Sequence, residues 1–390
     1  MSDRHRGKGL SDYTAFLIFN AVFFMMDTVS SYFNIYLDQL GFTKTMIGTV
    51  TGVASLAAML FQPAAGMLMD RSASRTRIMQ LLILMTAVLY PLLLANNAFL
   101  YVLAVYTVYF ISNRLQHTVN TALSVQFAEE SGRDYGPIRM MGAVGYTCMM
   151  WVVSFVAGTE NGVVKTFWVY SALCVGTILL MFPLPPMPGR NQGRGGSRVS
   201  PFSLLKDRNV VRLICFHTLI ATANSIGQTY FPIYVASDMG AGNSLYGAMV
   251  AVGAMLEIPF LFLTDRIIRR LGLRKTILAL GLLVALRWGN AYFAAGAFQL
   301  FLTQGMNFVI IVEGVAIAIL INRQVRPEVK TVAQTLVATI QGLAGILVSS
   351  FLGGILADSF GIRPLFLLSA GIALATAFLF WFLPPKESGQ

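Results

Sequence analysis

Charged side chains interrupt several apolar stretches that are otherwise long enough to span a membrane. These side chains are Asp27, Arg114, Arg139, Glu257, Arg287 and Glu313. A charge at the centre of a spanning helix costs about 2.5–3.5 kcal/mol to insert, so it needs a partner or a wet cavity. We therefore expect these groups to line the interior of a helical bundle, where carboxylates can bind and release protons.

Asp27 is the candidate proton carrier of the first apolar stretch. The stretch also carries polar residues at a spacing of three to four, namely Ser30, Ser31 and Asn34. This spacing places them on one face of a helix. Desolvation and an approaching cation can shift the proton affinity of such a carboxylate. The pattern leaves a second interpretation open, in which Arg114 or Arg139 permanently neutralises Asp27 and holds two helices together.

The acids of the second half stand at positions where a helix can bend or pack closely. Glu257 lies two residues before Pro259, and Glu313 directly precedes Gly314. An arginine at position 287 can donate to either acid and drive proton release when the pair reforms. We predict that Asp27, Glu257, Glu313 and Arg287 carry proton coupling, without choosing between the two glutamates. A static ion pair through Arg287 is the alternative.

Uncharged polar side chains inside the apolar stretches are the candidate solute ligands. Amides bind hydroxyls or ring nitrogens without a fixed charge, which suits a neutral polar solute, although each amide can also join two helices. The candidates are Asn34, Gln116, His117, Asn120, Asn224, Gln228, Gln304, Asn307 and Gln341.

The elements that position these residues are membrane-spanning helices. Of the 390 residues, 56% are hydrophobic and only 12% are charged, which excludes an ordinary soluble protein. The apolar stretches are hydrophobic on all sides, so they do not alternate as the strands of a membrane barrel do. We predict an all-α integral membrane protein. The twelve expected spans are 13–37, 45–69, 77–96, 99–123, 138–158, 163–183, 210–236, 243–264, 275–296, 298–321, 331–356 and 363–384.

The longest polar break divides the chain into two halves. Residues 184–209 are rich in Pro, Gly and Arg and cannot fold as a domain. We predict six-helix bundles over 1–183 and 210–390, joined by this cytoplasmic linker. With the N-terminus inside, the inner segments hold 22 Lys and Arg against three outside, so both termini are expected in the cytoplasm of a multi-pass inner-membrane protein. Topology and anionic lipid explain the net charge of +11 without a nucleic-acid partner.

A short motif recurs at helix ends. Residues 66–71 read GMLMDR with Arg75 beyond, residues 262–266 read FLTDR, and residues 353–361 read GGILADSFG. An acid at a helix end can bind a neighbouring helix by a charge-assisted hydrogen bond, and recurrence in both halves favours an internal repeat. The predicted gating residues are Asp70, Arg71, Arg75, Asp265, Arg266 and Asp358.

Four further segments carry a family pattern. They are LFQPAAGMLMD (60–70), YGPIRMMGAVGY (135–146), LEIPFLF (256–262) and ALRW (285–288). With them the sequence resembles the major facilitator superfamily over nearly its whole length, and within it the chain is most similar to the lactose permease group and to nucleoside and phenylpropionate proton symporters. The resemblance implies two pseudo-symmetric six-helix bundles, alternating access and proton-driven import. It also implies that Arg139 binds substrate, that Tyr146 supplies an aromatic ring, and that Arg287 is the ninth-helix arginine.

Two positions depart from the family pattern. The fourth-helix acid that partners the substrate-binding arginine is missing, because Ser124 stands near its place. Each glutamate lies one helical turn beyond the family's position, where this chain has Ala254 and Ile310. Arg139 therefore needs another anion, for which Asp27 is the candidate, or else an anionic solute.

Together these features predict a proton-coupled symporter that imports a small polar solute such as an oligosaccharide, another sugar or a nucleoside. Alternatives are efflux of amphipathic drugs, uptake of an aromatic or sugar carboxylate, and a sensor. The three histidines are widely spread, which disfavours an enzyme, and no G-x-x-x-x-G-K-[ST] loop is present. We expect no cofactor or metal, the proton as coupling ion, and the lipid bilayer and a small molecule as partners of a functional monomer.

Overall fold

The structure is a computed structural model of the chain. It describes residues 3–70, 72–184, 187–188, 208–324 and 330–382. Arg71 and most of the predicted linker, 184–209, lie outside the described residues. The side chains of Asp70 and Asp265 lie outside the described part as well.

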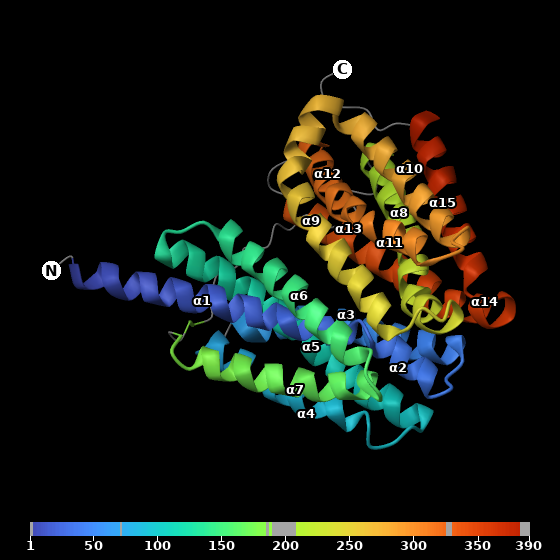
Figure 1. Ribbon diagram of the computed structural model, residues 1–390. Helices are drawn as coiled ribbons and strands as arrows, with labels where there is room; N and C mark the ends of the chain where they lie inside the picture. Colours follow the sequence, from blue (N-terminus) through green and yellow to red (C-terminus); the bar gives the residue numbers. More distant parts are fainter. Residues whose placement is uncertain (1–2, 71, 185–186, 189–207, 325–329, 383–390) are drawn as a thin grey trace. The chain divides into compact units, whose positions relative to one another are not determined.

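The described residues form helices joined by short connections (Figure 1). Broken helices are numbered by their parts, and two short π-helical segments, η2 and η4, continue α-helices. The bounds are α1 Asp3–Ser30, α2 Phe33–Gln39, α3 Lys44–Asp70, α4 Arg75–Leu92, α5 Phe99–Ser131, α6 Tyr135–Ala157, α7 Gly162–Met181, α8 Arg208–Ile233, η2 Tyr234–Asp238, α9 Asn243–Leu271, α10 Leu273–Tyr292, α11 Ala297–Gly305, α12 Phe308–Gln324, α13 Lys330–Gly345, η4 Ile346–Leu352, α14 Gly353–Phe360 and α15 Arg363–Phe382.

The all-α membrane fold predicted from the sequence is confirmed. Each expected span coincides with one helix or with a helix broken by a turn, as at α1 and α2 or α11 and α12. Within the described residues, eight helical segments are long and apolar enough to cross a membrane. The two parts of α9, bent by 42° beside Pro259, count as a ninth if taken together.

The chain divides into two compact units. Unit 1 comprises 1–42, 50–193 and 242–251, and unit 2 comprises 43–49, 194–241 and 252–390. Two short segments thus belong to the unit opposite the one that holds the rest of their helix: the start of α3 lies in unit 2 and the start of α9 in unit 1. The predicted bundles, 1–183 and 210–390, stay a prediction.

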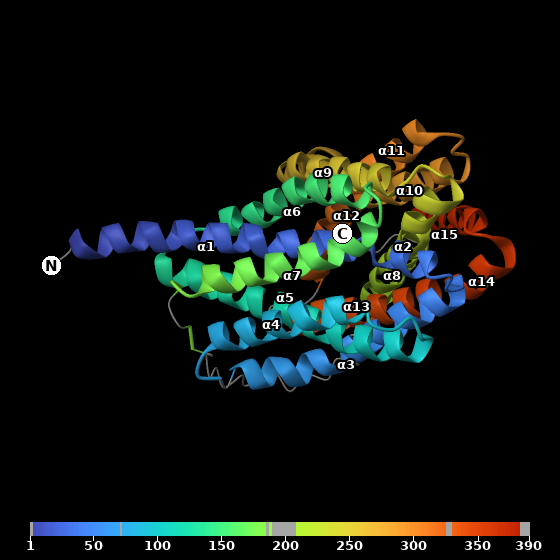
Figure 2. The ribbon, with the colours of Figure 1, turned by 60° about the horizontal axis from the view of Figure 1, so that its bottom comes forward.

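The core of unit 1 is aromatic. Helices α1, α4, α5, α6 and α7 run side by side in both ribbon views (Figures 1 and 2). Tyr90 on α4 lies 4.4 Å from Phe167 on α7 and 4.7 Å from Tyr109 on α5, measured between ring centroids. These rings are fully buried, and their bulk keeps the three helices at fixed distances. The rigid cluster fixes Tyr109, which also lines the polar cavity described below.

Unit 2 has an aromatic centre where α8, α10 and α15 meet. Trp288 stacks on Phe366 at 5.6 Å and meets Phe231 edge-on at 6.0 Å. Gly227 allows this contact, because a Cβ there would lie 2.5 Å from the Trp288 ring. The ring cluster sets the depth of α10, and therefore of Arg287 next to Trp288.

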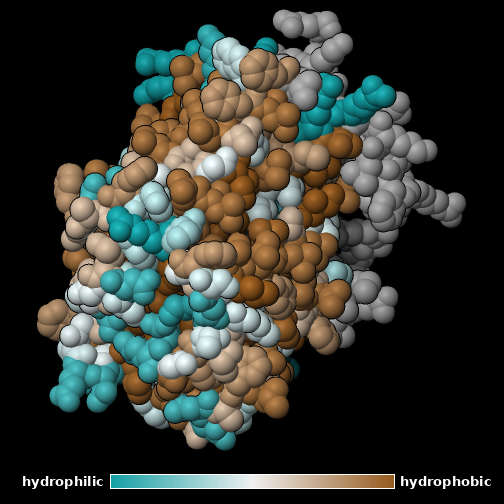
Figure 3. All heavy atoms as spheres, turned by 90° about the vertical axis from the view of Figure 1, so that its right-hand side faces the viewer, coloured by the Kyte–Doolittle hydropathy of each residue, from teal (hydrophilic) through white to brown (hydrophobic). Residues whose placement is uncertain are grey.

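The outward faces of the helices are apolar, as a lipid solvent requires. Figure 3 shows one face on which hydrophobic side chains form a broad patch between groups of hydrophilic ones. Patches of this size in a water-soluble protein would cause association. On α15 the exposed hydrophobic residues include Leu367, Leu374, Phe378, Trp381 and Phe382.

Gly145 offers a test of the packing of unit 1. A Cβ at Gly145 would lie 2.2 Å from the Ala21 carbonyl oxygen, because α6 and α1 are in backbone contact there. We expect Gly145→Ala to lower the free energy of unfolding by about 1–3 kcal/mol. Gly176→Ala on α7 is the matched control, since nothing lies within 4 Å of a Cβ at that position. Equal thermal unfolding midpoints for the two purified variants would contradict this packing.

Candidate functional site

A polar cavity of about 260 Å³ lies inside unit 1, between α1, α5 and α6. Hydroxyl, amide, carboxylate, imidazole and guanidinium groups share its wall with three aromatic rings. It is lined by Asp27, Ser30, Ser31, Tyr109, Phe110, Asn113, Arg114, His117 and Tyr146. A wall of this composition can bind several hydroxyls and stack on a sugar or base ring.

The chemistry of this cavity centres on a carboxylate and a histidine. Asp27 Oδ1 lies 3.0 Å from His117 Nε2, and about a fifth to a quarter of each side chain is exposed. The Phe23 and Phe24 rings meet the imidazole edge-on at 5.2 and 5.8 Å. The pair is thus packed on one side and open to the cavity on the other, where it can exchange protons with water or contact a solute.

A break in the first span positions Asp27. The Ser30 hydroxyl donates to the Asp27 carbonyl oxygen at 2.7 Å, and the Thr28 hydroxyl donates to the Met25 carbonyl oxygen at 2.6 Å. Such side-chain bonds compete with the helical ladder and favour a bend. Helix α1 ends at Ser30 and α2 begins at Phe33, so Asp27 stands one turn before the break.

The two arginines of unit 1 take different places. Arg114 lines the cavity, with its guanidinium 4.7 Å from the centre of the Phe110 ring. Arg139 is exposed and lies over the Phe24 ring at 4.8 Å. Sequence analysis had proposed Arg139 as the binding arginine and Asp27 as its anion, whereas the hydrogen bond described for Asp27 goes to His117.

Of the other unit 1 candidates, one lines the cavity and two join helices. The Tyr146 hydroxyl faces the cavity 3.3 Å from Ser31 Oγ. Gln116 is fully buried and donates to the Leu82 carbonyl and the Thr86 hydroxyl of α4. Asn120 donates to the Asn20 side chain at 3.2 Å, and Asn20 donates to Ser124 at 3.0 Å. Asn34 lies on α2 and is half-buried.

Unit 2 contains a second histidine and carboxylate pair, which is more deeply buried. Glu313 on α12 places Oε1 2.7 Å from His217 Nδ1 on α8. The other imidazole nitrogen lies 2.8 Å from Gln341 Oε1 on α13. Only 10% of the His217 side chain and 5% of the Glu313 side chain are exposed. Two sequence candidates, Glu313 and Gln341, are therefore joined through a histidine that was not among the candidates.

Arg287 is the centre of an amide cluster. Its side chain is fully buried and donates to the side-chain oxygens of Asn224, Gln228 and Gln304 at 2.9–3.0 Å. It also donates to the Thr303 carbonyl at 3.0 Å. The described hydrogen bonds therefore go to neutral oxygens of α8 and α11, and the three amides predicted to bind solute accept three of the five guanidinium N–H groups.

Glu257 is placed by a kink and a helix break. It precedes Pro259 within α9, and Asn307, between α11 and α12, donates a short hydrogen bond to its carboxylate. One turn further along α9, the Phe260 ring stacks on Phe308 at 3.6 Å. The two glutamates within the spans of unit 2 thus have different surroundings. Glu257 is partly buried beside an amide, and Glu313 is buried beside an imidazole.

The described gating candidates differ in their surroundings. Arg75 is buried at the start of α4 and donates to Gln126 at 3.0 Å, and Gln126 donates to Glu130 at 2.8 Å. Arg266 is exposed. Asp70, Arg71 and Asp265 lie outside the described residues or side chains, so their predicted role stays a prediction.

Asp358 caps the first turn of another helix. Its carboxylate accepts from the backbone N–H groups of Lys44 at 2.7 Å and Thr45 at 2.8 Å, at the start of α3. An anion at a helix N-terminus satisfies unpaired donors and interacts favourably with the dipole. We expect Asp358→Ala to lower the free energy of unfolding by about 1–2 kcal/mol. Ser359→Ala is the control, because Ser359 bonds only within its own helix; equal loss in both variants would contradict the cap.

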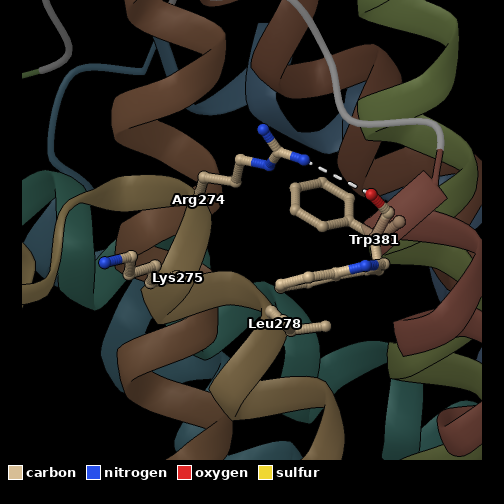
Figure 4. Close-up of a pocket in the computed structure, with 5 residues that line it drawn as sticks. Arg274, Lys275, Leu278 and Trp381 are labelled. Carbon is tan, nitrogen blue, oxygen red and sulfur yellow. Dashed lines mark hydrogen bonds between the residues drawn. The ribbon is translucent and has the colours of Figure 1, made fainter.

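A smaller hollow of about 210 Å³ lies at the ends of α10 and α15 (Figure 4). Leu278 and the rings of Phe380 and Trp381 form its floor, while Arg274 donates to the Trp381 carbonyl at 3.3 Å. It contains none of the candidate solute or proton residues. Its position beside basic residues and exposed rings is typical of a membrane interface.

The comparisons with known proteins agree with the fold. Residues 13–368 match the model of the MFS_1 like family. The chain belongs to this family of the major facilitator superfamily. Its fold matches the crystal structure of the nucleoside transporter NupG with a TM-score of 0.83, at 16% identity and over 96% of this chain and 99% of that one.

Several relatives of this chain are named as sugar transporters. The chain is 24% identical to the raffinose permease of Escherichia coli, over 71% of this chain and 70% of that protein. It is 26% identical to a putative sugar efflux transporter of Deinococcus radiodurans, over 87% of this chain and 88% of that protein.

Sequence reasoning missed His217 and did not include Arg114 among the binding residues. Both lay within predicted spans, and His217 follows the apolar run of α8 at a depth where a titratable group needs a partner. A search for all titratable residues within spans, and not only for formal charges, would have found His217. The helix rotation that places the exposed Arg114 in the cavity wall is set by packing against neighbouring helices, which no local pattern encodes.

Proposed function

We propose that this protein is a proton-coupled secondary active transporter of the cell membrane that imports a small polar solute, such as an oligosaccharide, another sugar or a nucleoside. It acts by alternating access as a monomer with both termini in the cytoplasm. It performs no enzymatic reaction and needs no cofactor. The observation that carries the proposal is the polar cavity of unit 1 with Asp27 and His117 in its wall.

The cavity suits one ring of a neutral solute. Its volume of about 260 Å³ is just below the range of about 300–1,000 Å³ typical of pockets for drug-sized ligands. Tyr146, Asn113 and the two serines offer donors and acceptors, while Phe110 and Tyr109 offer ring faces. An amphipathic drug would need a larger and less polar wall, so drug efflux is less well supported.

Sugar efflux is a second candidate function. The relative from Deinococcus radiodurans, which matches most of this chain, is named as a putative sugar efflux transporter. Import and efflux use the same cavity and differ in the direction in which the gradient drives the cycle. The sequence and the cavity therefore support the solute class more strongly than the direction.

A transport screen tests the proposal. The purified protein is reconstituted in proteoliposomes with an acidic exterior and a negative interior, and labelled raffinose, melibiose, lactose, maltose and uridine are offered. We expect at least one solute to accumulate and a protonophore to abolish its accumulation. Accumulation of none of these solutes, or accumulation that survives the protonophore, would contradict proton-coupled import. Proton-driven loss of preloaded solute under the reverse gradient would favour efflux.

A variant of Arg114 tests whether the arginine of the cavity wall binds the solute. Because its guanidinium lies in the cavity wall, we expect Arg114→Gln to weaken solute binding at least about tenfold, the effect of losing roughly one charged hydrogen bond. Arg133→Gln is the matched control, since Arg133 also lies over an aromatic ring, Tyr13, at 4.6 Å but outside the cavity. Binding of the screened solute is measured by counterflow; equal losses in both variants would contradict the assignment.

A further inference from the structure

His217 is held between two oxygen atoms from two other helices. Its Nδ1 lies 2.7 Å from the Glu313 carboxylate and its Nε2 lies 2.8 Å from the Gln341 side-chain oxygen. Helices α8, α12 and α13 bring these groups together inside unit 2. The imidazole is therefore bound at both ends in the buried interior, unlike His117, whose described partner is Asp27 alone and which faces the cavity.

The hydrogen-bonding pattern determines which protonation states fit. A neutral imidazole has one donor and one acceptor, whereas an imidazolium has two donors. Two oxygen partners with an ionised Glu313 require the imidazolium. A neutral imidazole fits the same position only if the Gln341 amide turns over and presents its NH2 group, or if Glu313 takes up the proton. One added proton and one amide rotation therefore interconvert two fully satisfied arrangements.

The charges near this site are few. Helices α10, α12, α13, α15, η2 and η4 pack against α8, and the acid of η2, Asp238, is its last residue. On these helices, the charged groups within the spans are Glu313 and Arg287, and Arg287 donates to neutral oxygens. The remaining charged residues of these helices, and the basic residues of α8 itself, stand in first or last turns. These are Arg208, Arg212, Arg274, Lys275, Arg323, Lys330 and Arg363.

Weaker titratable groups do not take part in the contact. On α8, Cys215 is exposed and the Tyr230 hydroxyl donates to the Ser350 carbonyl. Tyr292 stands at the last residue of α10, where its ring contacts Phe293. The protonation of His217 is thus set by its burial and by its two partners, Glu313 and Gln341.

We propose that His217 and Glu313 form the proton-binding site of the transport cycle, with Gln341 as the positioning residue whose amide orientation follows the proton. The proposal rests on the proposed function and assigns its coupling ion to one site. A proton from the outer solution binds the imidazole and forms an imidazolium beside ionised Glu313. Release of that proton to the cytoplasm restores the neutral imidazole, and no other bond is made or broken.

In this arrangement, the orientation of the Gln341 amide depends on whether His217 holds the proton. Gln341 on α13 presents its side-chain oxygen to protonated His217 and its NH2 group to neutral His217. The amide group that points away from His217 therefore changes with the proton as well. Helix α13 continues through η4 into α14, whose Asp358 caps the start of α3. The unit 1 pair, Asp27 and His117, then remains available to the solute.

Nitrogen-15 NMR of the full-length protein in nanodiscs tests the proposal without a transported solute. The chain has only three histidines, so labelled histidine gives three pairs of signals, and His5→Gln and His117→Gln assign them. We expect both His217 nitrogens to carry protons at low pH and one to lose its proton within about pH 5–9. A His217 that keeps one neutral tautomer over that range would overturn the proposal.

Two variants test the partners. We expect Glu313→Gln to lower the midpoint of the His217 titration by about 1–3 pH units, because the opposite charge is removed. Gln341→Glu should raise it by adding a carboxylate at Nε2, and Cys215→Ser, on the exposed face of α8, should leave it unchanged. If the midpoint of the His217 titration does not differ between the Glu313→Gln and Gln341→Glu variants, the proposal is overturned. Transport in the screen with a non-titrating His217 would refute this site alone, whereas a titrating His217 without any transported solute would refute the proposed function alone.

Discussion

Glu313→Gln is expected to abolish accumulation of solute against a gradient and to leave exchange of solute across the membrane intact. A glutamine keeps the size of the side chain and can still bond to His217 Nδ1, which lies 2.7 Å from the carboxylate. It cannot ionise, so the cycle loses the charge that attracts the proton. Uptake driven by the proton gradient should fall to the equilibration level, while counterflow of the screened solute should continue.

Glu257→Gln and Glu160→Gln complete the comparison. Glu257 is partly buried beside Asn307, and we expect its loss to impair accumulation as well, since an intramembrane acid is retained only for a function. Glu160 is exposed between α6 and α7, so its glutamine variant should behave as the parent. Normal accumulation by both the Glu313 and Glu257 variants would exclude proton coupling through unit 2.

The sequence predicted the helices well because their determinants are local. Apolar stretches of spanning length, Pro and Gly at the breaks, and polar loops are read directly from neighbouring residues. The internal breaks were less visible. At the end of α1, the hydroxyl groups of Ser30 and Thr28 bond to the carbonyls of Asp27 and Met25, which favours a break. Other spans tolerate Ser and Thr without a break, so these residue types alone do not predict one.

Pairing inside the bundles could not be predicted in the same way. Sequence analysis identifies Glu257, Glu313 and Arg287 as intramembrane charges and expects Arg287 to donate to either glutamate. In the structure Glu313 bonds to His217, and Arg287 donates to amides on α8 and α11. The partner of a side chain depends on the rotation and depth of several helices, and those follow from bulky contacts such as Trp288 on Phe366.

Unit 1 illustrates the same limit. Arg114 and Arg139 both occupy predicted spans, and the family resemblance selected Arg139. Both side chains are exposed, but packing places Arg114 in the cavity wall and Arg139 over Phe24. A motif match transfers a position along a helix, but the face that this position presents depends on the neighbouring helices. The kinds of side chain in the site were therefore predictable from the sequence, whereas the particular residues that line it were not.

Arg287→Leu is expected to have the largest effect on stability. The guanidinium is fully buried and donates to four oxygens at 2.9–3.0 Å. Leucine fills part of the volume but removes a donor from the buried Gln304 oxygen, the part-buried Gln228 oxygen and the Thr303 carbonyl, while Asn224 keeps the Trp288 indole N–H. Each unsatisfied buried polar group costs about 1–3 kcal/mol, so we expect a loss of at least about 3 kcal/mol in the free energy of unfolding. Lysine cannot reproduce the fork of donors, and Arg287→Lys should fall between the parent and the leucine variant.

Arg274→Leu is the control for this prediction because it makes the same change on the same helix. Arg274 is exposed at the start of α10, where one described hydrogen bond, at 3.3 Å, joins it to the Trp381 carbonyl (Figure 4). Thermal unfolding of the purified variants in detergent, followed by circular dichroism, compares them. If both leucine variants lose the same stability, the Arg287 cluster does not hold unit 2 together. A parent-like Arg287→Leu that fails only in proton-driven uptake would instead assign Arg287 to coupling, because hydrogen bonds that stabilise the fold cannot be removed without lowering its unfolding midpoint.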